Sequence, residues 1–155
     1  MPVAMELSRI IISEINDQQV IYLKEIDGPR TFPILIGIFE ATSIDRRVKG
    51  FEAPRPLTHD LLETIMSDLG GSLVKIHVDD LKGDTYVGTV FVKHGAEVRH
   101  FDARPSDSIA LALGNGVPIF VSEAVLKRAN DVVPEPPQEE ETRPPLGDSE
   151  GLKTL

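Results

Sequence analysis

The sequence contains no cysteine and no tryptophan, and aromatic residues make up only 5% of its 155 residues. Without cysteine the chain cannot form disulfides or thiolate metal sites, and we expect it in the reducing cytoplasm. No apolar run approaches the roughly 20 residues of a membrane-spanning helix, and the N-terminus lacks the pattern of a secretory signal. Neither a membrane association nor secretion is therefore expected. The hydrophobic content of 41% suffices for a core, which must be largely aliphatic.

The negative charge is unevenly distributed along the chain. Of the net charge of −9, residues 131–155 carry −5, with seven acidic and two basic side chains. The remaining residues are only mildly acidic, which argues against tight general binding to a phosphate backbone. Residues 131–155 are also rich in proline and poor in apolar residues, so burial cannot offset the entropy of ordering them. We predict one compact domain over residues 1–130 and a disordered acidic tail over residues 131–155.

Apolar periodicity and turn signals predict the secondary structure of residues 1–130. Strands are predicted at residues 5–15, 20–23, 32–36, 74–78, 86–92, 98–102 and 118–121. Helices are predicted at residues 38–49, 58–69, 106–113 and 123–130. Pro33 places the third strand near a sheet edge or at a strand start, because proline cannot donate to a ladder. Strands and helices are segregated rather than strictly alternating, which favours an α+β fold with a largely antiparallel sheet packed against helices.

The helix over residues 58–69 has a single apolar stripe. Its members are Leu61, Leu62, Ile65, Met66 and Leu69. The spacing is that of one helix face. The helix over residues 106–113, in contrast, is apolar almost all round, and we expect it to be buried centrally.

Two segments repeat one pattern at the predicted helix starts, RPLTHD at residues 55–60 and ARPSD at residues 103–107. Each contains Arg-Pro, then a hydroxyl residue, then an aspartate before an apolar run. Proline pre-sets a helical φ, and the hydroxyl of Thr58 or Ser106 is expected to cap the helix. An aspartate in the first turn is favoured by the helix dipole.

These segments resemble motifs of the bifunctional nuclease family, a group of α+β domains assigned DNase and RNase activity. The resemblance rests on IGIFEA at residues 36–41, RPLTHDL at residues 55–61 and DARPSDSIALA at residues 102–112, with PIFV at residues 118–121. It covers about residues 5–130. It implies an enzyme that hydrolyses phosphodiester bonds of DNA or RNA.

Candidate site residues follow from the needs of phosphodiester hydrolysis. Carboxylates can hold Mg²⁺ or Mn²⁺, arginine can clamp a phosphate, and histidine can move protons near neutral pH. We therefore predict a divalent metal cofactor. The catalytic candidates are His59, Asp60, Asp102 and Asp107. The phosphate-binding candidates are Arg55 and Arg104. The metal-ligand candidates are Asp60, Asp102, Asp107 and Glu40.

Each candidate also has a structural interpretation. Asp60 and Asp107 stabilise a helix start whatever the function, Arg55 and Arg104 can form internal ion pairs, and His59 can be a hydrogen-bonded structural residue. The alternative function is a non-catalytic oligomeric or regulatory binding module with the same fold. A homo-oligomer, most simply a dimer, is expected under either interpretation, because a small sheet has edges to cover.

One basic cluster stands apart from these motifs. Arg46, Arg47 and Lys49 could contact nucleic acid. We interpret them instead as a solvated helix end, since basic residues near a helix C-terminus are favoured by its dipole.

Overall fold

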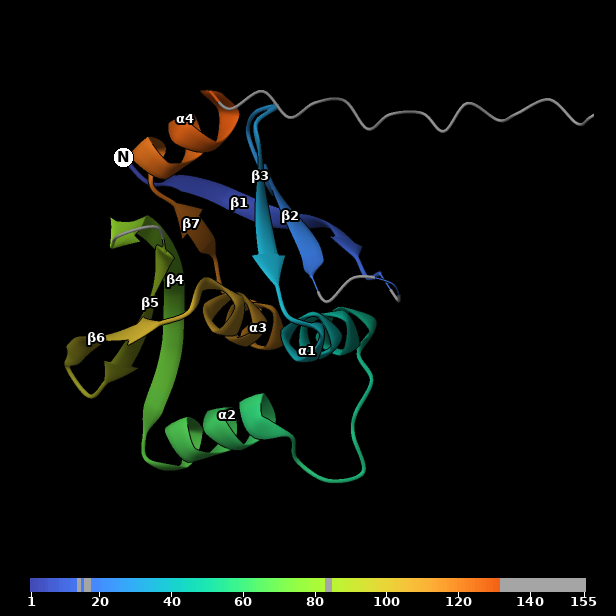
Figure 1. The fold of residues 1–155 in the computed structure, drawn as a ribbon. Coiled ribbons are helices and arrows are strands. Elements are labelled where there is room, and N and C mark those ends of the chain that lie inside the picture. Colours follow the sequence, from blue (N-terminus) through green and yellow to red (C-terminus); the bar gives the residue numbers. More distant parts are fainter. Residues whose placement is uncertain (14, 16–17, 83–84, 132–155) are drawn as a thin grey trace, which may run out of the picture.

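Seven strands and four helices make up the part of the chain that the computed structural model describes, residues 1–13, 15, 18–82 and 85–131 (Figure 1). The strands are β1 (Val3–Ile11), β2 (Gln19–Glu25), β3 (Thr31–Ile36), β4 (Gly71–Lys82), β5 (Thr85–His94), β6 (Glu97–Ala103) and β7 (Ile119–Val121). The helices are α1 (Ile38–Lys49), α2 (Thr58–Asp68), α3 (Pro105–Asn115) and α4 (Glu123–Asp131). Of the predicted tail over residues 131–155, residues 132–155 lie outside the described residues. None of the described helices has the length and apolar character needed to cross a lipid bilayer.

The strands form one sheet in the order β3-β2-β1-β7-β4-β5-β6. All neighbours are antiparallel except β4 and β7, which run parallel. Strands β4, β5 and β6 form a meander. Strand β3 is one edge of the sheet, as Pro33 predicted, with this proline opposite Tyr22 of β2. The predicted α+β fold with a largely antiparallel sheet is confirmed.

Helix α3 is the central helix of the fold (Figure 1). It packs on β4 and β5 and against α1. Its residues Ile109 and Ala110 are completely buried. This confirms the expectation from its almost entirely apolar sequence. The core is aliphatic apart from a few residues, and its largest fully buried apolar side chains are Phe32, Ile21, Leu23, Ile44, Ile76, Ile109 and Leu126.

The turn from β6 into α3 lies close against β5. A β-carbon at Gly88 of β5 would come within 2.5 Å of Ser108 Oγ and 2.9 Å of the Ala103 carbonyl oxygen. The buried hydroxyl of Ser108 in turn donates a 3.1 Å hydrogen bond to the Arg104 carbonyl. The missing side chain of Gly88 thus lets the start of α3 sit directly on the sheet, which fixes where Arg104 lies.

The predicted caps of α2 and α3 are wrong in detail. The N-cap residues are Leu57 and Arg104, and no side chain of either helix start makes the cap bond expected of Thr58 and Ser106. Both hydroxyl residues already lie inside their helices, because Pro105 occupies the first turn of α3 and Thr58 is the first residue of α2. At α2 it is the Asp60 carboxylate that accepts the exposed backbone N–H of Leu57, at 2.9 Å.

Candidate functional site at the helix starts

His59 links α2 to both neighbouring helices. Its Nε2 lies 2.9 Å from Asp107 Oδ1 on α3, and its Nδ1 lies 2.7 Å from Ser43 Oγ on α1. Because an ionised carboxylate can only accept, Nε2 carries the proton, and in the corresponding neutral tautomer Nδ1 accepts from the Ser43 hydroxyl. Ser, His and Asp also follow one another in nucleophilic triads, but there Nε2 faces the serine and Nδ1 faces the aspartate. The reversed arrangement here, with His59 only 12% exposed, fits a residue that holds three helices together.

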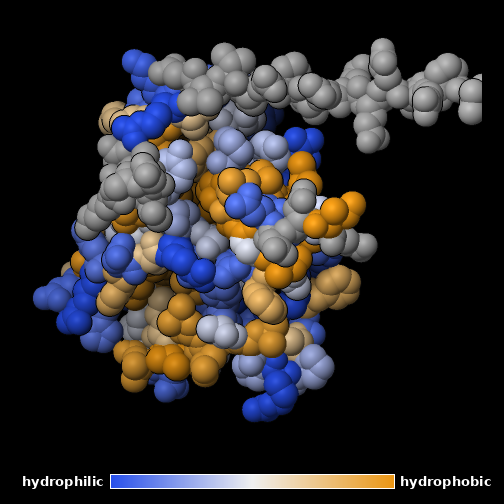
Figure 2. Space-filling view, viewed as in Figure 1, coloured by the Kyte–Doolittle hydropathy of each residue, from blue (hydrophilic) through white to orange (hydrophobic). Residues whose placement is uncertain are grey.

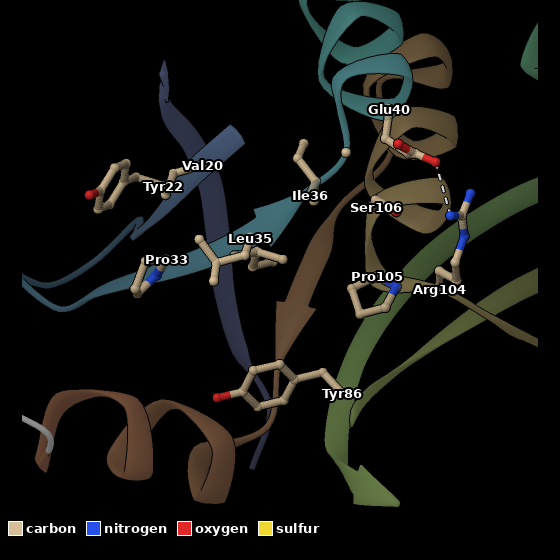
Figure 3. A pocket seen from close by; sticks show the side chains of 12 residues that line it. Val20, Tyr22, Pro33, Leu35, Ile36, Glu40, Tyr86, Arg104, Pro105 and Ser106 are labelled. Carbon is tan, nitrogen blue, oxygen red and sulfur yellow. Dashed lines mark hydrogen bonds and ion pairs between the residues drawn. The ribbon is translucent and has the colours of Figure 1, made fainter. Parts of the chain in front are cut away.

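Asp107 also anchors Arg104, the residue that precedes α3. Arg104 Nε donates to Asp107 Oδ2 at 2.7 Å and Nη2 donates to Oδ1 at 3.1 Å. The third nitrogen, Nη1, donates to Glu40 Oε1 on α1 at 2.9 Å (Figure 3). The side chain of Arg104 nevertheless remains 63% exposed. A histidine, two carboxylates and an accessible guanidinium therefore form one connected group.

A second network lies beside the first and is more deeply buried. Asp60 accepts from Nη2 of Arg46, at 3.0 and 3.2 Å, and from Nη2 of Arg47, at 3.0 Å. Arg47 also pairs with Glu63, one turn further along α2. Glu63 in addition accepts from the side-chain amide of Asn115 at the end of α3, at 3.0 Å. These contacts tie the polar face of α2 to α1 and α3.

The networks shift the pKa values of their members. For Asp60, the backbone hydrogen bond from Leu57 lowers the pKa most, and the two arginines add to it. Partial burial alone would raise the pKa of Asp107, but the hydrogen bonds from Arg104 and His59 and the charge of Arg104 outweigh it and lower the pKa. Asp107 and Glu40 together raise the pKa of Arg104. Both aspartates are thus held in the ionised form.

The structure brings together only some of the predicted site residues. His59, Asp107, Arg104 and Glu40 share one network, whereas Asp60 belongs to the other.

The other two candidates stand apart from both networks. Asp102 is exposed on β6, opposite Thr89. Arg55 is exposed in the segment before α2. Neither side chain makes a hydrogen bond or ion pair with another described residue.

The predicted metal ligands do not fit a metal ion in this arrangement. Within the described ranges, no three His, Cys, Asp or Glu side chains form a group that could hold one. Asp60 is paired with two arginines, Asp107 with Arg104 and His59, and Glu40 with Arg104. The divalent cofactor therefore stays a prediction.

A cavity of about 710 Å³ lies next to Arg104. Its wall is mostly apolar, with Tyr22 and Leu35 on one side and Tyr86 and Pro105 on the other (Figure 3). Arg104 and Glu40 are the charged residues that line it. This combination of an apolar wall and a few polar groups is typical of small-molecule binding sites.

Sequence reasoning missed several members of the networks. Ser43, Glu63 and Asn115 carry no motif. The solvated helix end predicted for Arg46 and Arg47 is wrong, because the side chain of Arg47 is only 5% exposed and that of Arg46 16%. The signal for these ion pairs in the sequence was that Asp60 and Glu63 are three residues apart, on one face of α2, and that Arg46 and Arg47 are adjacent in α1.

The fold and site define an α+β domain in which two Arg-Pro segments place charged side chains around the starts of two helices. Residues 21–134 match the bifunctional nuclease domain family. The chain belongs to this family. It is also 41% identical over 133 residues to the Uncharacterized protein MT1877 of Mycobacterium tuberculosis strain CDC 1551 / Oshkosh, covering 86% of this chain and 79% of that protein. The Uncharacterized protein Rv1829 of strain H37Rv shows the same identity and coverage.

Proposed function

We propose that this chain is a nuclease that cleaves phosphodiester bonds of DNA or RNA and binds the phosphate at Arg104. Family membership supports an activity on nucleic acids. The observation that carries the assignment to this site is the exposed guanidinium of Arg104 on the wall of a cavity that also contains Glu40.

Arg104 is held in place and still has donors to offer. A guanidinium has five N–H donors. Three of those of Arg104 donate to the carboxylates of Asp107 and Glu40. Nη1 and Nη2 therefore each keep one N–H for a ligand. The N–H groups of a guanidinium can donate to the oxygens of a phosphate.

The remaining residues take complementary roles in this proposal. Glu40 Oε1 contacts Arg104, and its carboxylate can accept a proton from the attacking water. As the water oxygen bonds to phosphorus, the P–O bond to one sugar oxygen breaks, and that oxygen takes a proton from solvent. Arg104 then stabilises the charge that develops on the phosphate. Asp107 and His59 act as positioning residues, since Asp107 fixes Arg104 and His59 fixes Asp107. The apolar wall with Tyr22 and Tyr86 supplies a surface for a base.

The charge of the site favours a second candidate function. With His59 neutral, Glu40 and Asp107 carry one more unit charge than Arg104 neutralises. This excess opposes a bare phosphate. It favours the alternative, a non-catalytic binding module in which the same residues hold the helices together.

The two candidates separate in a cleavage assay. Wild type, Arg104→Gln and Glu40→Gln are tested on plasmid DNA and on RNA with Mg²⁺, with Mn²⁺ and with EDTA. Under the nuclease proposal each variant loses about 100-fold or more of the activity, as for other oxyanion-stabilising groups. Arg99→Gln is the matched control, because Arg99 is similarly exposed at 61% on β6 and lies outside the site.

The outcomes are distinct. Equal cleavage by wild type and Arg104→Gln indicates a contaminating nuclease and contradicts the proposal. Loss of cleavage with an unchanged melting temperature supports it. Loss of wild-type activity in EDTA supports the predicted metal, and full activity in EDTA contradicts it.

A further inference from the structure

Helix α2 lies on the protein with its polar face inward. The side chains of α2 that contact the rest of the fold through hydrogen bonds are His59, Asp60 and Glu63. None of the residues of α2 is buried. An amphipathic helix ordinarily turns its apolar stripe to the core, so the orientation of α2 is the reverse of the usual one.

Met66 packs against the core, whereas the other apolar residues of α2 and of its two flanking positions face outward. We call these exposed residues the outer stripe, which consists of Leu57, Leu61, Leu62, Ile65 and Leu69. Their exposed fractions lie between 46% and 70%. Figure 2 shows hydrophobic side chains gathered over α2 on the lower part of this face. A contiguous exposed apolar surface of this kind marks an interaction site.

The spacing of the outer stripe is symmetric along the helix. Leu57, Leu61, Ile65 and Leu69 follow one another at intervals of four residues. If two copies of α2 pack antiparallel about a two-fold axis near Glu63, Leu61 of one copy meets Ile65 of the other. Leu57 likewise meets Leu69. A two-fold interface requires a surface that is complementary to itself, and rows at i±4 are the ridges by which helices pack.

The charges at the two ends of α2 support the same arrangement. Arg55 is exposed just before the helix and has no partner among the described residues. The last turn of α2 contains no basic residue and carries the exposed Asp68. Antiparallel packing brings Arg55 of each copy to the C-terminal end of the other α2, where a cation is favoured by the helix dipole. Parallel packing would instead place the acidic ends side by side.

We propose that the outer stripe of α2 is the interface of a homodimer formed by two antiparallel α2 helices. The occupant of the stripe is a second copy of this chain. The inference rests on α2 and Arg55 alone and does not depend on the nuclease proposal. Dimer formation therefore covers the apolar residues that α2 leaves outside.

The test is the mass of the full-length chain in sedimentation equilibrium. Wild type is expected at twice its 17.0 kDa chain mass at micromolar concentration. Ile65→Glu and Leu61→Glu are each expected to weaken association by about 100-fold or more, because dimerisation then buries an unpaired charge. Ile26→Glu is the matched control, since Ile26 is exposed to a similar degree in a turn away from α2 and its variant should remain dimeric. Circular dichroism checks that every variant is folded.

A cross-linking experiment tests the direction of packing. The absence of native cysteine makes any introduced one unique. A mixture of Leu61→Cys and Ile65→Cys chains should give covalent dimers with a short bismaleimide, well above the yield of either variant alone. Higher yields for each variant alone than for the mixture overturn the antiparallel arrangement. A monomeric wild type, or a dimer that persists unchanged in both glutamate variants, overturns the interface.

Discussion

The guanidinium of Arg47 lies against the backbone of Gly114, in the space that a β-carbon at this position would occupy. Such a β-carbon would also come within 2.6 Å of Glu63 Oε1. The close approach lets Arg47 reach Asp60 and Glu63 while its side chain is almost completely buried. Gly114 in α3 therefore has a role in holding α2.

This contact predicts that Gly114→Ala lowers the free energy of unfolding, whereas the same change in most helices raises it. Gly→Ala within a helix usually stabilises by about 0.5–1 kcal/mol. In this chain Gly114→Ala should instead destabilise by about 1–3 kcal/mol, as expected for overpacking. In an Arg47→Met background the guanidinium is gone and the end of the Glu63 side chain can move aside, so the same Gly114→Ala change should become neutral or stabilising. The four free energies of unfolding in urea form a double-mutant cycle. Equal effects of Gly114→Ala in both backgrounds would show that Arg47 does not require the glycine.

The two arginines of the site should differ in their contribution to stability. Arg47 is buried between two carboxylates, so Arg47→Gln leaves Glu63 without an arginine partner and should cost about 3–5 kcal/mol. Arg104 is mostly exposed, and Arg104→Gln should cost about 0–1 kcal/mol. Urea unfolding of the two variants measures the difference. Similar costs for both would mean that the buried network does not hold α2.

Stability should also fall in acid through Asp60. The pKa of this carboxyl is lowered in the folded chain by the Leu57 backbone N–H and by Arg46 and Arg47. The stabilisation is therefore fully present above the ordinary carboxyl pKa of about 3.9. It is lost as the pH falls through the lower folded value. The free energy of unfolding of wild type should exceed that of Asp60→Asn at about pH 6, and the two should converge towards about pH 2.

A control isolates this carboxyl from general acid effects. Asp27→Asn changes an exposed turn residue for which the structure shows no hydrogen bond or ion pair to the described residues. Its difference from wild type should be small and should vary little with pH. If Asp60→Asn behaves in the same way, the ion pairs of Asp60 do not contribute to stability.

The sequence was sufficient to predict the elements because their signals are local. The alternation of Val74, Ile76 and Val78 and the turn residues around them define strands within a few positions. The almost entirely apolar α3 could only be buried. These patterns predicted the α+β fold without knowledge of any long-range contact.

The direction in which α2 faces could not be predicted in this way. It depends on whether the polar residues of the helix find partners elsewhere, and His59 meets Asp107 across 48 residues of sequence. An apolar stripe by itself predicts an inward face, whereas ion pairs with Arg47 place it outside. The same limit applies to the site, where Asp60 and Asp107 occupy equivalent motif positions but belong to different networks.

Pro33 makes the edge strand β3 a poor template for pairing with a strand of another chain. An incoming chain that aligned along this edge would meet a pyrrolidine ring in place of one amide donor, so its ladder would be interrupted. Unlimited addition of strands, the route to fibrils, is thereby discouraged on this side. The protein can expose a short, partly apolar β3 to solvent at high concentration with less risk of precipitation.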